Sequence, residues 1–401
     1  MAAHRQSQTV MRKILLFILT GLTLTTGLSQ VPYIQQISPM DGSTQSRVII
    51  TGSGFSATSS NLAVTFDNVR AVINASTEFT IDVTLPVQAR AGNVEVTNLV
   101  SGLSAKSPQK FVPYYSGSTF DPSKVSAPLA VASTKELFDI CSCDFDMDGK
   151  TDFGITKFST VDDPAATDLV IMQNQSTPGT MNFTTFNKAT LSNLNVNAPT
   201  FNLNCGDLDG DGKPDLVATR AGASRNALFV LRNTNSVAGT LSFGAPVSLF
   251  LNPGEFAFRV SIRDLNYDGK PELIVSNSFD DPSSDNVISI FVNQSTSGVV
   301  KFAATPIRLT ITGAGTTYGL DVQDLDGDQK PEIILNQFQT NDLFVLRNQS
   351  TGQISFATPQ KISFTGFFNN VISGDVNGDG LLDLLLTSTF DNFLHVLPNQ
   401  S

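Results

Sequence analysis

The chain has 401 residues, of which 40% are hydrophobic and 15% charged, with 25 Lys and Arg against 36 Asp and Glu. This composition excludes a disordered chain, because charge is sparse and apolar content is high enough for two or three domains with sizeable cores. A net charge of -11 without a basic cluster beyond residue 13 argues against a nucleic-acid binder. The two histidines leave little material for histidine-based catalysis.

The first 29 residues are predicted to be a signal peptide. Arg12 and Lys13 precede the apolar run from Ile14 to Leu22, which ends in a small-residue site around Gly27 and Ser29. An anchor helix is the alternative, but the run is too short for a hydrocarbon core about 30 Å thick. No later segment approaches the roughly 18 apolar residues that a spanning helix needs. We therefore expect a secreted or cell-surface protein without a transmembrane segment.

Residues 31–113 read as short strands of a β-sandwich. Segments such as Val48-Ile-Ile-Thr-Gly-Ser-Gly-Phe55 and Gly92-Asn-Val-Glu-Val96 alternate apolar and polar residues between turn signals. The Ile37-Ser-Pro39 and Gly52-Ser-Gly-Phe55 pieces resemble the IPT/TIG immunoglobulin-like domain. In exported proteins that resemblance implies a spacer or binding module. Residues 111–117 then form a linker to the remainder of the chain.

From residue 144 onward a nine-residue acidic loop recurs five times, with starts 63, 57, 60 and 51 residues apart. Short apolar runs such as Leu228-Phe-Val-Leu231 surround each loop, and no useful stretch has helical periodicity. Each unit therefore reads as four short strands. Four strands every fifty to sixty residues favour propeller blades over a solenoid, whose repeats are usually shorter.

The loops have the chemistry of calcium sites, because acidic or amide oxygens at positions one, three, five and nine surround one point and position seven offers a carbonyl. A hard cation takes six to eight oxygens, and we expect about one Ca²⁺ per loop, up to five. The candidate ligands are Asp144, Asp146, Asp148 and Asp152; Asp207, Asp209, Asp211 and Asp215; Asp264, Asn266, Asp268 and Glu272; Asp324, Asp326, Asp328 and Glu332; Asp375, Asn377, Asp379 and Asp383.

Position six of the loop is expected to adopt a left-handed backbone for a sharp turn. Glycine fills this position in four loops, at Gly149, Gly212, Gly269 and Gly380. Gln329 replaces it in the fourth loop, where we expect strain or weaker binding.

The simple alternative to calcium sites is a set of solvated acidic turns. The five loops, however, hold 18 of the 36 acidic residues of the chain. Placing three or four carboxylates in one short turn costs free energy through like-charge repulsion unless a cation sits between them. The count therefore favours metal binding, with the loop used as a hairpin between strands.

The acidic loops and the segment Phe243-Gly-Ala-Pro246 resemble the FG-GAP (VCBS-type) repeats of integrin alpha-subunit propellers and of many exported bacterial proteins. The resemblance covers about residues 114–401. It implies an all-β calcium-bearing propeller that acts mainly as an extracellular interaction module, and it identifies no ligand. Familiar members have seven blades, whereas five repeats are visible here.

Two arrangements of the blades stay open at this stage. Each unit is expected to end in a Phe-bearing outer strand, such as Leu241-Ser-Phe-Gly-Ala-Pro246. The segment from Thr119 to Leu129, ahead of the first loop, resembles this strand and would complete the last blade to close a ring of five. Alternatively, the five repeats are part of a larger ring.

Three smaller features complete the sequence-based predictions. Cys141, Cys143 and Cys205 allow at most one disulfide. His395 occupies a place held by phenylalanine in other units, so a packed histidine is expected. Sequons at Asn174, Asn293, Asn348 and Asn399 fall at one blade turn, where asparagine suits the backbone.

Two classes of function survive. The first is a non-catalytic, calcium-stabilised adhesion or ligand-binding scaffold with an extracellular protein or polysaccharide as partner. The second is an exported polysaccharide lyase or glycoside hydrolase. Such an enzyme needs one repeat with more candidate catalytic groups than the other repeats, and no repeat of this kind is visible. Variable connections at the mouth opposite the acidic loops are the expected contact surface, with Arg220, Arg225, Phe279, Phe338 and Phe390 as candidate contacts.

Overall fold

The computed structural model describes residues 31–87, 89–114, 137–157, 169–177, 180–185, 200–220, 227–279, 286–312, 317–337, 342–364, 368–377, 379, 381–388 and 393–400. The predicted signal peptide lies outside these residues. Val31 to Ser401 belong to one compact unit. No helix in the described part is long and apolar enough to cross a membrane.

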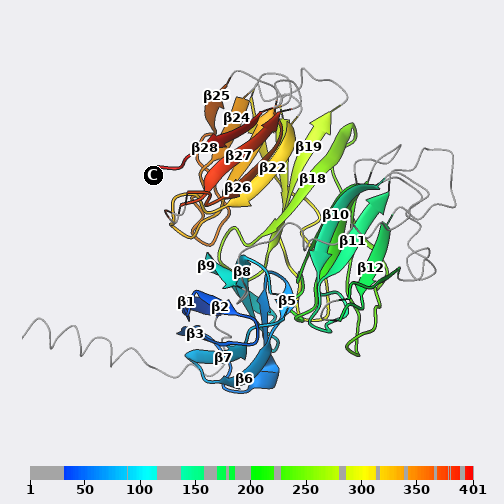
Figure 1. The fold of residues 1–401 in the computed structure, drawn as a ribbon. Helices are drawn as coiled ribbons and strands as arrows, with labels where there is room; N and C mark the ends of the chain where they lie inside the picture. Colours follow the sequence, from blue (N-terminus) through cyan, green and yellow to red (C-terminus); the bar gives the residue numbers. More distant parts are fainter. Residues whose placement is uncertain are drawn as a thin grey trace, which may run out of the picture. The chain divides into compact units, whose positions relative to one another are not determined.

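The N-terminal domain is a sandwich of two sheets around one apolar core (Figure 1). Val48 and Ile50 on one sheet and Val94 and Val96 on the other are fully buried because alternate residues of each strand face inward. One sheet has the order β1 (Tyr33–Ser38), β3 (Arg47–Ser53), β7 (Thr80–Thr84), β6 (Val72–Ser76); the other has β2 (Asp41–Ser43), β9 (Leu103–Tyr114), β8 (Gly92–Asn98), β4 (Leu62–Phe66), β5 (Val69–Arg70), and a 3-10 turn spans Ser59–Asn61.

In the described residues five antiparallel sheets follow, four with four strands and the last with three, and the first strand of each packs against the first strand of the next as in propeller blades (Figure 1). The predicted all-β fold, a sandwich followed by blades of four-stranded type, is confirmed. The blades are β10 (Leu137–Cys143), β11 (Asp152–Lys157), β12 (Leu169–Asn174), β13 (Phe183–Thr185); β14 (Thr200–Gly206), β15 (Asp215–Arg220), β16 (Ala227–Leu231), β17 (Val247–Phe250); β18 (Glu255–Arg263), β19 (Glu272–Phe279), β20 (Asn286–Phe291), β21 (Ile307–Ile311); β22 (Thr317–Gln323), β23 (Glu332–Gln337), β24 (Asp342–Leu346), β25 (Gln360–Ser363); and β26 (Phe368–Gly374), β27 (Asp383–Ser388), β28 (Leu394–Leu397).

The middle strands of a blade are apolar on both faces because the blade lies between two others. All five residues of β16 are buried, with Leu228 and Val230 in the core shared with the third blade and Leu231 in the core shared with the first. A disulfide between Cys143 and Cys205 joins the inner strands β10 and β14 across the first blade interface. Strand runs that read as uniformly apolar are therefore core strands.

In the second, third and fourth blades, the outer strand lies later in the chain than the Phe-bearing segment predicted to form it. Phe243 makes an isolated bridge with Asn233, and β17 begins only at Val247. Phe302 and Phe356 bridge Asn293 and Asn348 in the same way, whereas Phe183 of the first blade does begin the outer strand β13. The sequence-based assignment of the outer strand was therefore wrong in these three blades.

The first blade differs from the interior ones in the exposure of its inner strand. Four residues before the loop, Ile140 of the first blade is 57% exposed, whereas Leu203 and Val260 at the same place are 4% and 5% exposed. Among the described elements, β10 and β26 make no extensive contact with each other. Residues 119–129, predicted to add an outer strand to the last blade, lie outside the described part of the chain.

Candidate metal centres

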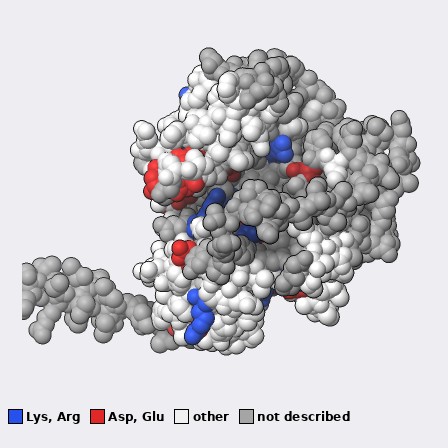
Figure 2. All heavy atoms as spheres, viewed as in Figure 1, with Lys and Arg blue, Asp and Glu red and all other residues white. Residues whose placement is uncertain are grey.

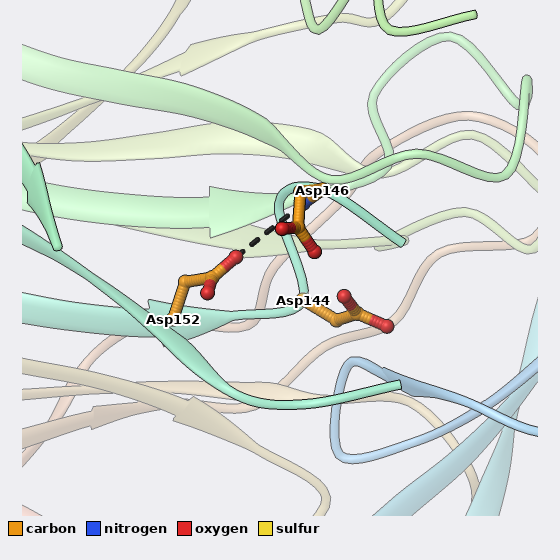
Figure 3. Close-up of side chains that lie close together, drawn as sticks. All are labelled: Asp144, Asp146 and Asp152. Carbon is orange, nitrogen blue, oxygen red and sulfur yellow. Dashed lines mark hydrogen bonds between the residues drawn. The ribbon is translucent and has the colours of Figure 1, made fainter. Parts of the chain in front are cut away.

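The first acidic loop, between β10 and β11, gathers three carboxylates (Figure 3). One oxygen from each of Asp144, Asp146 and Asp152 lies within 4.8 Å of the other two, and all three residues are almost fully buried. Buried carboxylates are normally paired or bound to a metal. The second and fourth loops form clusters by the same measure, with Asp207, Asp209 and Asp215 in one and Asp324, Asp326 and Glu332 in the other.

Backbone amides hold these carboxylates in place. Asp144 accepts the N–H groups of Asp148 and Gly149, each at 3.0 Å. Asp152 accepts the N–H of Asn174 on the third strand at 2.7 Å, which ties the end of the loop to the sheet. Because each carboxylate oxygen has two lone pairs, such an oxygen can still bind a cation.

The carboxylate at position five lies outside these clusters. Its Oδ2 atom, called the outer oxygen below, pairs with the lysine at position seven. Lys150 Nζ lies 2.7 Å from Asp148 Oδ2, and Lys213 Nζ lies 2.6 Å from Asp211 Oδ2. The structure thus brings positions one, three and nine together in the first, second and fourth loops, and it leaves position five facing a cationic side chain.

The turn requires left-handed backbone at two positions, of which sequence reasoning identified one. At position six, φ is 83° at Gly149, 79° at Gly212 and 80° at Gly269, and Gln329 adopts the same region at 70°. Gln329 has a Cβ, so its left-handed conformation is strained by about 1–2 kcal/mol. Position four is left-handed as well and accommodates a non-glycine residue at Tyr267, where φ is 63°.

Burial makes the charged forms of these carboxylates costly. Burial, and to a smaller degree the neighbouring carboxylates, raises the pKa of Asp144 to about 7 and that of Asp152 to about 8. Burial, with Glu95 and the other loop carboxylates, raises the pKa of Asp207 to about 8. A bound cation would relieve this cost by favouring the ionised forms.

The third loop also has a buried carboxyl at position nine. Glu272 accepts the N–H of Leu265 at 2.9 Å through Oε2, whereas Oε1 is buried and faces the backbone N–H of Asn293 without a hydrogen bond of normal geometry. Burial raises the pKa of this carboxyl to about 8 and that of Asp264 at position one to about 6. A cation with oxygen ligands would satisfy such a poorly paired buried oxygen.

The fifth loop is described at its ends and in part of its turn. Asp383 at position nine accepts the N–H of Val376, as position nine does in the other loops. Gly380, predicted to give this loop its left-handed turn, lies outside the described residues. On the face drawn in Figure 2, acidic side chains gather in one patch beside the strands of the last blades.

Comparison with known families agrees with this geometry. The family model of the FG-GAP-like repeat matches residues 207–275, 264–335 and 324–386, and that of the IPT/TIG domain matches residues 32–113. The chain carries FG-GAP-like repeats behind an IPT/TIG domain. Both resemblances predicted from the sequence are therefore confirmed, although the first acidic loop precedes the matched repeats.

Solved structures with a similar chain path have low identity to this protein. An auxiliary nutrient binding protein from Bacteroides ovatus is 13% identical, covering 92% of this chain and 84% of its own, with a TM-score of 0.37. An auxiliary nutrient binding protein from Bacteroides thetaiotaomicron is 10% identical, with coverages of 92% and 98% and a TM-score of 0.37. The Dos1 propeller is 10% identical, with coverages of 93% and 74% and a TM-score of 0.38. No curated protein matches the chain.

Each FG-GAP-like repeat is joined to the preceding one by an asparagine that follows the third strand. Asn233 Nδ2 donates to the carbonyl of Phe145 in the preceding loop at 2.8 Å and to that of Pro214 in its own loop at 3.1 Å. Equivalent bonds connect Asn293 to Leu208 and Pro271, Asn348 to Leu265 and Pro331, and Asn399 to Leu325. Neighbouring acidic loops are thus linked by one side chain.

Three of these asparagines, Asn293, Asn348 and Asn399, are sequons noted in the sequence, and the fourth sequon, Asn174, occupies the same place in the first blade. Asn174, Asn293 and Asn348 are at most 5% exposed, and their Nδ2 atoms donate to backbone carbonyls. The interpretation that asparagine serves the blade turn is supported, and its further role between blades was missed. The signal that could have revealed it is the recurrence of asparagine at the same place in all five units.

The IPT/TIG domain contacts the acidic-loop ends of the first three blades. The N–H of Asp144 donates to the Asn68 carbonyl at 3.3 Å, and the N–H of Ser104 donates to the Gly269 carbonyl at 2.8 Å. Arg70 Nη1 donates to the carbonyl of Gly212 at 2.9 Å. Burial lowers the pKa of Arg70, while nearby acidic-loop carboxylates, Asp207 first among them, oppose this shift. This interface was not predicted from the sequence.

The other candidate residues have less to do with metal binding. The ring of His395 packs edge to face on Phe368 at 4.9 Å, as expected for a packed histidine. Cys141 stays a thiol, and burial raises its pKa. The side chains of the five candidate contacts at the opposite mouth, Arg220, Arg225, Phe279, Phe338 and Phe390, lie outside the described residues.

Proposed function

We propose that this protein is a secreted or cell-surface, non-catalytic scaffold whose acidic loops bind calcium. In this proposal residues 1–29 are a removed leader, residues 31–113 a spacer or binding domain, and residues 114–401 a calcium-stabilised propeller. The observation that supports it best is the gathering of three carboxylates in each of the first, second and fourth loops, with one oxygen of each within 4.8 Å of the others.

The residues fit a hard divalent cation better than a transition metal. Every side-chain donor in the loops is a carboxylate or amide oxygen, and no histidine or cysteine belongs to the described clusters. Oxygen ligands of this kind favour calcium, which tolerates irregular coordination. When bound, calcium would supply positive charge between carboxylates that otherwise repel each other. The first, third and ninth loop residues, which lie together in three loops, would hold it, and the fifth would join through the oxygen that does not face the lysine.

Thermal unfolding tests this proposal. Calcium that binds only the folded loops should raise the free energy of unfolding by about 2.7 kcal/mol per site at a concentration 100 times Kd, and the melting temperature with it. The purified protein would be melted in EDTA, in millimolar calcium and in millimolar magnesium, with isothermal titration calorimetry to count sites. An identical melting curve in EDTA and calcium would contradict the metal assignment.

The scaffold requires a partner, and we place its surface at the mouth opposite the acidic loops. The IPT/TIG domain contacts the loop ends of three blades, which supports a structural role for that mouth. The partner class is an extracellular protein or polysaccharide. A binding screen against both classes, with and without calcium, should yield a ligand whose binding is lost on Arg220→Glu with Arg225→Glu at unchanged melting temperature. Binding that survives this change but is lost on altering the IPT/TIG domain would contradict the placement.

A further inference from the structure

In three blades, the residue immediately before the asparagine that follows the third strand contacts the acidic loop of its own blade. In the second blade, Arg232 Nε lies 2.5 Å from Asp209 Oδ2, and its Nη2 lies 2.6 Å from Asp211 Oδ2. In the fourth blade, Arg347 Nη2 lies 2.8 Å from Asp326 Oδ2. One guanidinium thus bridges the outer oxygens of positions three and five in the second loop, and an equivalent guanidinium binds position three in the fourth.

The first blade uses a neutral donor at the same place. Gln173 donates through Nε2 to Asp146 Oδ2, again at position three, and also to the carbonyl of Gly239 at 3.0 Å. All three loops with aspartate at position three therefore have a side-chain donor before the bridging asparagine.

The two remaining blades differ at both places together. Position three is Asn266 in the third loop and Asn377 in the fifth, and the residues before the bridging asparagine are Val292 and Pro398, which have no side-chain donor. In the fifth loop the amide does the bridging itself, because Asn377 Nδ2 donates to Asp379 Oδ2 at 2.9 Å. Position three and the residue before the asparagine therefore vary as a pair within this one chain.

Electrostatics explains the pairing. Aspartates at positions three and five lie two residues apart in a tight turn, and their like charges repel. A guanidinium between their outer oxygens offsets the repulsion with charge-assisted hydrogen bonds. An asparagine at position three removes one charge and donates to the other carboxylate, so no external donor is needed. The four carboxylates of the second loop together with Arg232 then carry the same net charge as the three carboxylates of the third loop, which has no arginine beside it.

We propose that Arg232 and Arg347 are positioning residues that supply positive charge from within the protein at two acidic loops. They hold the outer oxygens of positions three and five, so these loops keep their shape when no divalent cation is bound. The proposal builds on the calcium-binding function only in that last respect, because the charge pairing itself is independent of any metal.

The test is a double-mutant cycle on the second loop, read out by melting temperature in EDTA and in calcium. Arg232→Met keeps most of the apolar stem and removes the charge, while Asp209→Asn converts position three to the form found in the third and fifth loops. Arg308→Met is the matched control, because Arg308 pairs with the buried Glu255 away from every acidic loop.

Arg232→Met should lower the melting temperature by several degrees in EDTA and by clearly less in calcium. Adding Asp209→Asn should recover most of the loss in EDTA, whereas Arg308→Met should cost the same in both solutions. Equal losses for Arg232→Met in both solutions, without recovery by Asp209→Asn, would overturn the proposal. If calcium leaves the wild-type protein unchanged, the calcium function fails, yet recovery in EDTA would still establish the charge pairing.

Discussion

The second and fourth acidic loops have nearly the same sequence and very different surroundings. Both place an arginine beside positions three and five, and both gather carboxylates at positions one, three and nine. The side chain of Asp209 is fully buried, whereas that of its counterpart Asp326 is 26% exposed. The local motif therefore sets the shape of the loop, while burial is set by what packs on it.

The difference comes from the IPT/TIG domain. A Cβ on Gly210, at position four of the second loop, would lie 1.9 Å from the carbonyl oxygen of Gly102 in the sandwich. A Cβ on Gly327, at the same position of the fourth loop, would meet nothing within 4 Å. The glycine at position four therefore serves only the turn in the fourth loop, whereas in the second loop it also allows the sandwich to approach the blade closely.

The largest expected effect is loss of the carboxylates at positions three and five. In calcium, Asp209→Ala with Asp211→Ala should destabilise the protein more than Asp326→Ala with Asp328→Ala. Each pair removes a site worth about 2.7 kcal/mol at 100 times Kd, and the first also leaves the half-buried Arg232 unpaired. Melting curves of the two double variants measure the difference. Equal losses would mean that burial by the sandwich adds nothing to the second site.

The next prediction separates the cost of a left-handed turn residue from the cost of a collision between the two domains. Gly327→Ala should cost about 1–2 kcal/mol, because the alanine adopts a left-handed backbone there and meets no neighbour. Gly210→Ala meets the same strain and also collides with backbone, so it should cost clearly more. Chemical denaturation of both variants tests this order. A result in which both cost the same would show that the sandwich moves away freely from the second loop.

Sequence alone was sufficient for features that repeat with a fixed local pattern. The acidic loops, the short strands and the sandwich follow from spacing and alternation, which act over a few residues. The left-handed turn at position six was predicted from Gly149 and its equivalents, and Gln329 adopts it as well. Such features need no knowledge of the neighbouring domain.

What sequence missed depends on contacts between distant segments. Arg70 binds Gly212 across 142 residues, and Asn233 binds Phe145 across 88. Neither partner is suggested by its local pattern, because the docking of domains and blades sets these contacts. The outer strand of the second blade was misplaced for a related reason. A phenylalanine recurs at the place of Phe243 in other repeats, yet Phe243 forms a bridge with Asn233 and does not start β17.

The last comparison of the two loops is a pH dependence in calcium-free protein, which should be stronger for the second loop than for the fourth. Burial raises the pKa of Asp207 from its ordinary value of 3.8 to about 8, whereas for Asp324 the shift is upward and smaller. The folded protein therefore binds more protons than the unfolded chain between these pKa values. Stability from this group is full below pH 3.8 and is lost as the pH rises toward 8.

The melting temperature of protein freed of metal by dialysis should accordingly fall between pH 5 and pH 8, and millimolar calcium should flatten the curve by binding the ionised carboxylates. Asp207→Asn should remove part of the slope, and Asp324→Asn should remove less. A calcium-free melting temperature that rises over this range, or a larger effect of Asp324→Asn, would contradict the link between burial by the IPT/TIG domain and the electrostatic cost of the second loop.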